Sequence, residues 1–231
     1  MRKRFFVTGI DTDAGKTYVT VGLLEAAKRA GLKSLGLKPI AAGADRIEGS
    51  LRNDDALRIQ KASSVSLLYE QVNPVVLADA IAPHIAAMKE GRLITASRLE
   101  GFIKGALLTP HELALVEGAG GWRVPLNDRE LLSDVAKSLG FPVILVVNMK
   151  LGCLNHAILT AEAIARDGLT LAGWVANNST SERMPCYEEN LASLTSMLPV
   201  PLLGTLSWCQ EESESQQDFD AILSALVSST L

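Results

Sequence analysis

The sequence predicts an α/β protein built on a single doubly wound, mostly parallel sheet with helices on both faces. Short apolar, β-rich runs alternate along the chain with longer segments of helical periodicity, and this alternation is typical of such sheets. The runs are apolar at consecutive positions, as expected of parallel strands buried on both faces. In this class of sheet, ligands bind beyond the carboxyl ends of the strands. The candidate site should therefore follow directly after these runs.

The predicted elements follow one another without a long polar linker, a low-complexity tract or an internal repeat. Strands are predicted at residues 4–8, 34–40, 112–117, 142–148, 169–177 and 200–203. Helices are predicted at residues 16–29, 54–62, 95–107, 131–139, 154–166 and 188–197, with a last surface helix at 217–231. We expect residues 1–231 to form one domain.

The composition is that of a globular protein, with 48% hydrophobic residues, and it argues against several classes of function. Lys and Arg number 22 against 26 Asp and Glu, a net charge of −4 that does not suit a broad nucleic-acid interface. The longest apolar run, residues 141–147, is too short for a membrane span. The apolar stretch after the basic start is too short for a secretion signal. The cysteines lack disulfide-framework or zinc spacing, so we expect a cytoplasmic protein.

The turn after the first strand has the features of a phosphate-binding loop. Gly9 and Gly15 are followed by Lys16 and Thr17 at the start of a predicted helix. N–H groups at a helix N-terminus bind anionic oxygens, the lysine reaches the β- and γ-phosphates, and the hydroxyl holds Mg²⁺. Five residues separate the glycines instead of the usual four, so Ile10 occupies the usual glycine position. An ordinary strand–helix turn is the alternative interpretation.

Two carboxylates in the same loop are unusual, because carboxylates repel phosphate. Asp11 and Asp13 need a cation to offset their charge, which Mg²⁺, Lys16 or a positively charged co-substrate could supply. An amine-bearing co-substrate is the most specific of these hypotheses, and two solvated loop acids are the alternative.

Further candidates lie where the next predicted elements meet. Lys38 ends the second strand, where its charge could stabilise a transferring phosphoryl group, although many strands end in a solvated lysine. Residues 51–56 are typical of a helix start, with Asn53 or Asp54 as the cap. Asp54 and Asp55 could also bind Mg²⁺ beside a nucleotide.

A third strand ends in an acid that is followed by glycines. Glu117 closes the apolar run 113–116, as the metal-holding acid of a nucleotide hydrolase does. The glycines among residues 118–121 allow a ligand to approach the backbone closely, and a plain glycine turn is the alternative.

The segment 148–156 joins another buried strand to a helix, whose free N–H groups could bind a carboxylate. Cys153 within it is expected to be a packed small residue. The histidines lack metal-ligand spacing, and the sequence contains no nucleophile motif. From these residues we predict an α/β enzyme that uses Mg²⁺ and ATP and has a second substrate.

Together these segments resemble the dethiobiotin synthetase family. The matching segments are residues 6–9, 11–12, 15–17, 38–39, 51–53, 55–56, 83–84, 116–122, 150–153, 155–156 and 172–177. They follow the family's order and spacing, including the five-residue gap in the loop. The resemblance implies a P-loop NTPase-like fold and a single ligase domain that depends on ATP and Mg²⁺ and acts in biotin biosynthesis.

The resemblance also implies the reaction and the partners. CO₂ forms a carbamate on one amine of 7,8-diaminononanoate, the carbamate takes the γ-phosphoryl group of ATP, and the other amine closes the ureido ring. Dethiobiotin, ADP and phosphate are the products. A diamine would account for the two acids of the loop. The family works as a homodimer with substrate at the interface, and neither nucleic acid nor membrane is implied as a partner.

By position, the resemblance assigns catalysis to Lys16 and Lys38, and Mg²⁺ binding to Thr17, Asp55 and Glu117. The residues implied in nucleotide binding are Asp13, Ala14, Gly15, Lys16, Thr17, Tyr18, Asp55, Glu117, Gly118, Ala119, Gly120, Asn177, Asn178, Leu206, Ser207 and Trp208. Asn177 would read adenine. The residues implied in substrate binding are Thr12, Lys38, Ala42, Lys150, Gly152, Cys153, Asn155 and Tyr187. Residues 152–155 and Tyr187 would contact the substrate carboxylate in the neighbouring subunit's site.

The sequence departs from the family at several positions. Ala42 replaces a common serine that touches substrate, and Asn178 replaces a frequent aspartate. Residues 206–208 lack the usual proline, and the C-terminal tail matches weakly. These departures concern the substrate and adenine contacts more than the reaction.

Other classes of function remain as alternatives. A nucleotide-switch ATPase of the partitioning or septum-positioning kind would carry an extra lysine early in the loop, and residues 9–14 contain none. A related ligase or amidotransferase would need an added glutaminase domain, for which 231 residues leave no room. A non-catalytic paralogue is a third alternative, suggested by Ala42.

Overall fold

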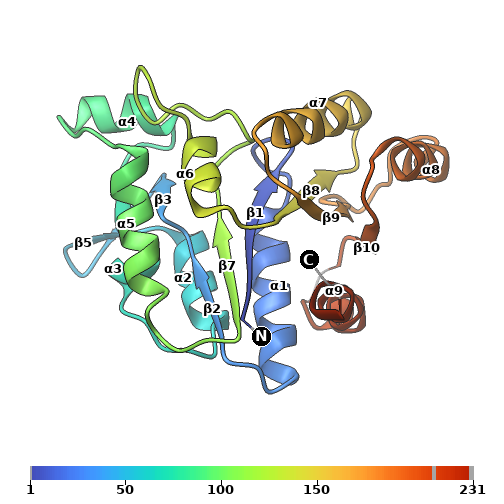
Figure 1. Cartoon of the computed structure of the whole chain (residues 1–231), viewed down its shortest axis with the longest axis horizontal. Coiled ribbons are helices and arrows are strands. Elements are labelled where there is room, and N and C mark those ends of the chain that lie inside the picture. Colours follow the sequence, from blue (N-terminus) through green and yellow to red (C-terminus); the bar gives the residue numbers. More distant parts are fainter. Residues whose placement is uncertain (1, 210–211, 229–231) are drawn as a thin grey trace.

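Six parallel strands form the central sheet of the computed structural model, which describes residues 2–209 and 212–228 (Figure 1). The strands are β1 (Lys3–Gly9), β2 (Ser34–Leu37), β7 (Leu113–Glu117), β8 (Val143–Asn148), β9 (Leu171–Asn177) and β10 (Leu202–Leu206). Their order across the sheet is β10-β9-β8-β1-β7-β2, and every pair is parallel. All positions of β2, β7, β8 and β9 are buried, which explains their unbroken apolar runs.

Helices cover both faces of this sheet. The helices α1 (Lys16–Arg29), α2 (Asp54–Ala62) and α9 (Gln216–Ser228) lie on one face, where α1 packs against both of the others. The other face carries α5 (Ala96–Ala106), α6 (Leu132–Leu139), α7 (Cys153–Arg166) and α8 (Tyr187–Met197). There α5 packs against α6, and α7 against α8. The predicted doubly wound parallel sheet is confirmed.

Several short elements lie outside those that the sequence predicts. They are the parallel pair β3 (Ile40–Ala42) and β6 (Val75–Leu77), the antiparallel hairpin β4 (Asp45–Ile47) and β5 (Ser50–Arg52), the helices α3 (Tyr69–Val72) and α4 (Pro83–Lys89), and the 3₁₀ helix η1 (Glu212–Ser215). Apart from α4, these elements have three or four residues, which is too few to show a periodic pattern.

Two predicted strands differ in extent. The strand expected at 34–40 ends at Leu37, and the chain leaves the sheet at Pro39, which has no N–H to donate. Ile40 then begins β3, which pairs with β6. The strand expected at 200–203 runs from Leu202 to Leu206, with a shift of register at its start. Residues 229–231 of the predicted last helix lie outside the described residues.

The strand order brings the predicted site residues to one edge of the sheet. The chain places β7 on one side of β1 and β8 on the other, so the winding direction reverses at β1. In open α/β sheets, ligands bind in the crevice beyond such a reversal. No helix in the described part of the chain is both long and apolar enough to cross a membrane.

Candidate active site

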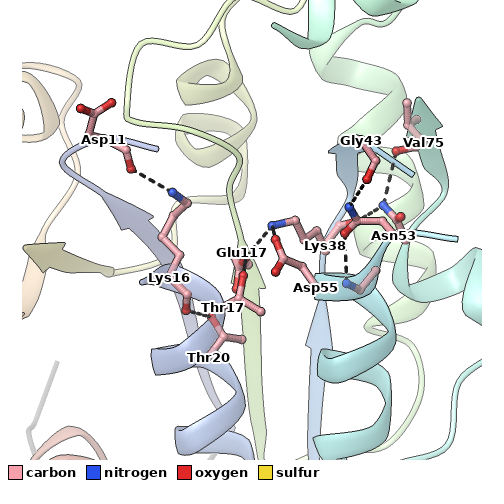
Figure 2. Close-up of polar contacts among 12 residues, drawn as sticks. Asp11, Lys16, Thr17, Thr20, Lys38, Gly43, Asn53, Asp55, Val75 and Glu117 are labelled. Atoms are coloured by element: carbon pink, nitrogen blue, oxygen red, sulfur yellow. Dashed lines mark hydrogen bonds and ion pairs between the residues drawn. The ribbon is translucent and has the colours of Figure 1, made fainter. Parts of the chain in front are cut away.

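The loop between β1 and α1 presents backbone N–H groups to the crevice. The hydrogen-bond ladder of α1 begins with Val19 N, which donates to Gly15 O at 3.0 Å. The N–H groups of Lys16 and Thr17 therefore precede the first hydrogen bond of the helix. Lys16 Nζ donates to Asp11 O at 3.0 Å, which folds the lysine back over the loop (Figure 2). This arrangement suits binding of a phosphate chain.

A charged cluster lies next to this loop and joins three further elements (Figure 2). Lys38 follows β2, and its Nζ donates to Glu117 Oε1 at 2.6 Å and to Asp55 Oδ2 at 2.9 Å. Thr17, in the first turn of α1, donates from Oγ1 to Glu117 Oε1 at 2.8 Å. Glu117 ends β7, and Asp55 lies in the first turn of α2. The structure thus brings four of the predicted site residues into direct contact.

Burial and ion pairing set the charge states in this cluster. Glu117 is 0% exposed and Lys38 only 5%. Burial disfavours the charged form of Lys38, but attraction to Glu117 and then to Asp55 outweighs burial and raises the pKa of Lys38. Burial likewise opposes ionisation of Asp55, and Lys38 outweighs it and lowers the pKa of Asp55. Burial lowers the pKa of Lys16, against the attraction of Glu117. Lys38 is therefore a protonated, fixed cation at neutral pH.

The backbone of Lys38 is bound on both sides by one short segment. Lys38 N donates to Val72 O at 2.8 Å, and Asn73 Nδ2 donates to Lys38 O at 2.6 Å. Both partners are buried. These bonds fix the point from which the Lys38 side chain extends.

Asn53 is the cap that positions Asp55. Its Oδ1 accepts from Ala56 N at 3.2 Å, and its Nδ2 donates to Gly43 O at 2.9 Å (Figure 2). Of the two caps considered from the sequence, the structure has Asn53. The cap places Asp55 in the first turn of α2, facing Lys38.

The residues predicted to bind Mg²⁺ fit such an ion. Thr17, Asp55 and Glu117 offer one hydroxyl and two carboxylates, and Mg²⁺ is usually bound by one or two carboxylates together with substrate phosphates. Oε2 of Glu117 is buried and has no hydrogen-bond partner, so one carboxylate oxygen remains available. Among the residues that the structure describes, no cluster of three or more His, Cys, Asp or Glu would hold a metal alone.

A cleft of ≈ 980 Å³ opens over the loop and the cluster. It is lined by Asp11, Thr12, Asp13, Gly15, Lys16, Thr17, Tyr18, Lys38, Ala41, Ala42, Asn53, Asp55, Arg58, residues 80–83, residues 119–121 and residues 123–125. Among the predicted substrate contacts, Thr12, Lys38 and Ala42 line it. Arg58 and Arg123 line it without having been predicted. Arg58 lies one helical turn after Asp55, so the spacing within α2 could have indicated it.

The residues after Glu117 do not all reach this cleft. Ala119 and Gly120 line it. Gly118 instead donates its N–H to Val7 O at 2.9 Å, and its backbone lies against the ring of Phe6. A contact between Gly118 and nucleotide stays a prediction.

Two asparagines lie at the carboxyl end of β9, beside the phosphate loop. Asn177 Nδ2 donates to Ala14 O at 3.1 Å, and its Oδ1 is buried without a hydrogen-bond partner. Asn178 Nδ2 donates to Leu206 O at 2.9 Å and to Tyr187 Oη at 3.3 Å. Leu206 ends β10, and the next two residues are exposed. The predicted nucleotide contacts of β9 and β10 thus join the loop through Asn177, and none of them lines the cleft.

The segment 150–155 and Tyr187 lie away from the cleft, and none of them lines it. The exposed residues of the segment are Lys150, Leu151, Gly152 and Asn155. Cys153 is buried, and burial raises the pKa of its thiol, as expected of a packed small residue. Tyr187 is buried at the start of α8. Their contact with substrate across a dimer stays a prediction.

Comparisons with known proteins agree on the fold. A family model described as an AAA domain matches residues 3–216. The septum site-determining protein MinD of Pyrococcus horikoshii, solved with Mg-ADP, superposes with a TM-score of 0.61 at 18% identity and covers 97% of this chain and 96% of its own. The MinD cell division ATPase of Pyrococcus furiosus gives a TM-score of 0.60 at 20% identity, with coverage of 98% and 99%. The fold is that of the P-loop NTPases, as predicted.

Sequence relatives are far more similar and point to one family. ATP-dependent dethiobiotin synthetase BioD of Cellvibrio japonicus is 57% identical over 205 residues, which are 89% of each chain. The enzyme of the same name from Marinobacter nauticus is 50% identical over 226 residues, 98% of this chain and 96% of its own. The corresponding protein of Escherichia coli O157:H7 is 47% identical over 215 residues, 93% and 95% of the two chains. The chain belongs to the ATP-dependent dethiobiotin synthetase BioD family.

Proposed function

We propose that the protein is a Mg²⁺-dependent dethiobiotin synthetase of biotin biosynthesis that converts 7,8-diaminononanoate, CO₂ and ATP to dethiobiotin, ADP and phosphate. Residues 1–231 would act as a single ligase domain. The observation that supports this best is the contact of Lys38 with Asp55 and Glu117 beside the phosphate loop. A fixed cation and two carboxylates in this position would lie beside the γ-phosphoryl group, with the carboxylates as ligands of Mg²⁺.

The proposed reaction has three steps. One amine nitrogen of the diamine attacks CO₂ and loses a proton, which gives a carbamate. A carbamate oxygen then attacks the γ-phosphorus of ATP, and the bond from that phosphorus to ADP breaks. Finally the second amine attacks the carbamate carbon and loses a proton as phosphate leaves, which closes the ureido ring.

Positive charge from the chain's own residues would stabilise the phosphoryl transfer. The backbone N–H groups of residues 16–18 bind the phosphate chain, and Lys16 can swing from Asp11 O to the β- and γ-oxygens. Lys38 holds its proton and acts by charge, since its pKa is raised. Thr17, Asp55 and Glu117 would hold Mg²⁺, which when bound neutralises phosphate charge.

The nucleotide base would lie against Asn177 and residues 206–208, at the carboxyl ends of β9 and β10. Asn177 already uses its Nδ2 on Ala14, so its unpartnered Oδ1 is the group available to accept from the adenine amino group. Cleft residues Asp11 and Asp13 would attract the amines of the substrate before one of them reacts.

A homodimer would complete the substrate site. Leu151 is 92% exposed in the loop before α7, and Leu159 on that helix is 55% exposed. Apolar side chains this exposed suit burial against a second copy. Such contact would bring residues 152–155 to the neighbouring cleft. Cys153 N already donates to Lys150 O, so other N–H groups in the first turn of α7 would bind the substrate carboxylate.

The first experiment is to measure phosphate release from Mg²⁺-ATP with bicarbonate, with and without 7,8-diaminononanoate, and to follow dethiobiotin by mass. We expect release that depends on the diamine, with one dethiobiotin formed for each phosphate. ATP hydrolysis indifferent to the diamine would reject the synthetase and favour a nucleotide switch.

Glu117→Gln is expected to raise the Mg²⁺ concentration needed for half-maximal turnover by about tenfold, the lower end of effects seen when metal-site partners are removed. Glutamine keeps the size of the side chain and an oxygen for Thr17 and Lys38, but it lacks the charge and the unpartnered oxygen. The measurement is turnover against Mg²⁺ at fixed ATP. Glu70→Gln, on the surface, is the matched control. A metal dependence equal to that of the wild type would remove Glu117 from the ligands.

A further inference from the structure

We propose that Tyr18 is a positioning residue that holds the base-binding wall, residues 206–208, against the phosphate-loop helix α1. The proposal rests on the proposed function, in which this wall contacts the nucleotide base. Tyr18 would act on the base through the wall, by way of its side-chain hydroxyl, while its backbone N–H belongs to the phosphate loop.

The hydroxyl of Tyr18 reaches the chain on the far side of the wall. It donates to Ser215 Oγ at 2.8 Å and lies 3.1 Å from Cys209 Sγ. Cys209 follows the wall directly, and its Sγ lies 3.4 Å from Ser215 Oγ. Ser215 is only 3% exposed, so this hydrogen bond is shielded from water. One side chain next to the loop residue Thr17 therefore binds the segment that carries the wall.

The ring of Tyr18 packs independently of its hydroxyl. It meets Phe219 of α9 edge-on, with ring centroids 5.3 Å apart and an interplanar angle of 68°. One turn further along α1, Phe219 also covers Gly22, where an added Cβ would lie 2.2 Å from the ring. The docking of α9 thus depends on ring packing, and the hydroxyl is a separate attachment that can be removed alone.

The wall has an attachment at each end. At its start, Leu206 O accepts from Asn178 N and from Asn178 Nδ2, both at 2.9 Å. At its far end, the contacts of Tyr18 with Cys209 and Ser215 hold the chain. Between them Trp208 is 44% exposed, and the segment has no proline to stiffen it. Loss of the far attachment would let the wall move away from the loop.

In this arrangement, binding of the base and binding of the phosphates depend on different parts of the chain. A looser wall weakens binding of any nucleotide that carries a base, while the loop and the charged cluster keep their geometry. A polyphosphate without a base does not touch the wall, so its affinity is the readout that distinguishes positioning from direct phosphate binding.

The test compares Tyr18→Phe, Ser215→Ala and the double variant. We expect each single variant to raise the KM for ATP and the Kd for Mg-ADP about fivefold, the usual effect of one hydrogen bond. The effect of the double variant should be smaller than the sum of the two single effects, because both variants remove the bond between Tyr18 and Ser215. In Ser215→Ala, which lies outside the cleft, we expect kcat at saturating ATP and the Kd of inorganic tripolyphosphate to keep their wild-type values. Ser193→Ala, whose hydroxyl bonds only within α8, is the control.

Three outcomes would overturn the proposal. If tripolyphosphate and ADP both bind equally more weakly, the hydroxyl acts on the phosphates and not on the base. If the effects of the two single variants add, the two hydroxyls do not share a bond. If the affinity for ADP is unchanged, the hydroxyl has no effect on the wall. If Tyr18→Phe fails to fold, the affinities of Ser215→Ala for ADP and tripolyphosphate test the proposal instead. These measurements need no turnover, so they stand apart from the diamine assay that tests the proposed function.

Discussion

A Lys38→Met variant is expected to turn over about 10²- to 10³-fold more slowly than the wild type while it still binds ATP, because one group that stabilises developing charge is lost. Methionine keeps the length and the apolar stem of the side chain. The variant therefore removes mainly the ammonium, which in the structure lies 2.6 Å from Glu117 Oε1. The phosphate loop is unchanged, so nucleotide binding should persist. The measurements are kcat for diamine-dependent phosphate release and the Kd of Mg-ADP.

The same variant is expected to be less stable by about 3–5 kcal/mol, because a buried charge loses its partner. Glu117 is 0% exposed and would keep only the hydroxyl of Thr17. Thermal unfolding therefore has to be measured with turnover, so that loss of folded enzyme is not counted as loss of catalysis. Lys137→Met removes an exposed lysine of α6 and is the matched control. Wild-type turnover in Lys38→Met would remove Lys38 from the catalytic residues.

Gly15→Ala is expected to abolish measurable ATP binding and to destabilise the fold by about 3 kcal/mol, the sum of left-handed strain and overpacking. Gly15 has a φ of +91°, and an added Cβ would lie 2.1 Å from Asn177 Nδ2. The methyl group would push Asn177 out of its bond to Ala14 and displace the loop. Nucleotide binding by calorimetry and the free energy of unfolding test both effects.

Gly31→Ala is the control that separates strain from collision. Gly31 has a φ of +74° in the turn after α1, and nothing lies within 4 Å of an added Cβ. This variant should show only the backbone strain, about 1–2 kcal/mol, with ATP binding intact. If the two variants lose stability equally and both bind ATP, the close approach of Asn177 to the loop has no importance.

The fold could be predicted because its main strands carry a strong local signal. β7, β8 and β9 are buried along their whole length, so the sequence shows apolar residues at consecutive positions. The pairing of β3 with β6 has no such signal, since each strand has three residues and their partners lie far apart in the chain. The end of β2 at Leu37 could have been inferred from Pro39, which cannot continue a ladder.

The part of the candidate site that follows from the parallel orientation of the strands could be predicted from the sequence. Residues that follow parallel strands gather at one sheet edge, which brings Lys38 and Glu117 to the loop that contains Thr17. The hydrogen-bond partners of the individual site residues could not be predicted from the sequence, because they depend on packing across the sheet. The bond from Tyr18 to Ser215 joins residues 197 positions apart, and no local pattern marks either of them.

The hydrogen bonds of Val72 and Asn73 to the backbone of Lys38 limit where the chain can be redesigned. Val72 accepts from the N–H of Lys38 and Asn73 donates to its C=O, and neither residue lines the cleft. The β4–β5 hairpin lines no part of the cleft either, and all three residues of β4 are exposed. A loop graft can therefore use the hairpin as its insertion point without moving the backbone of Lys38. Shortening the chain around residue 72 would instead shift Lys38 relative to the phosphate loop, although that segment lines no part of the cleft.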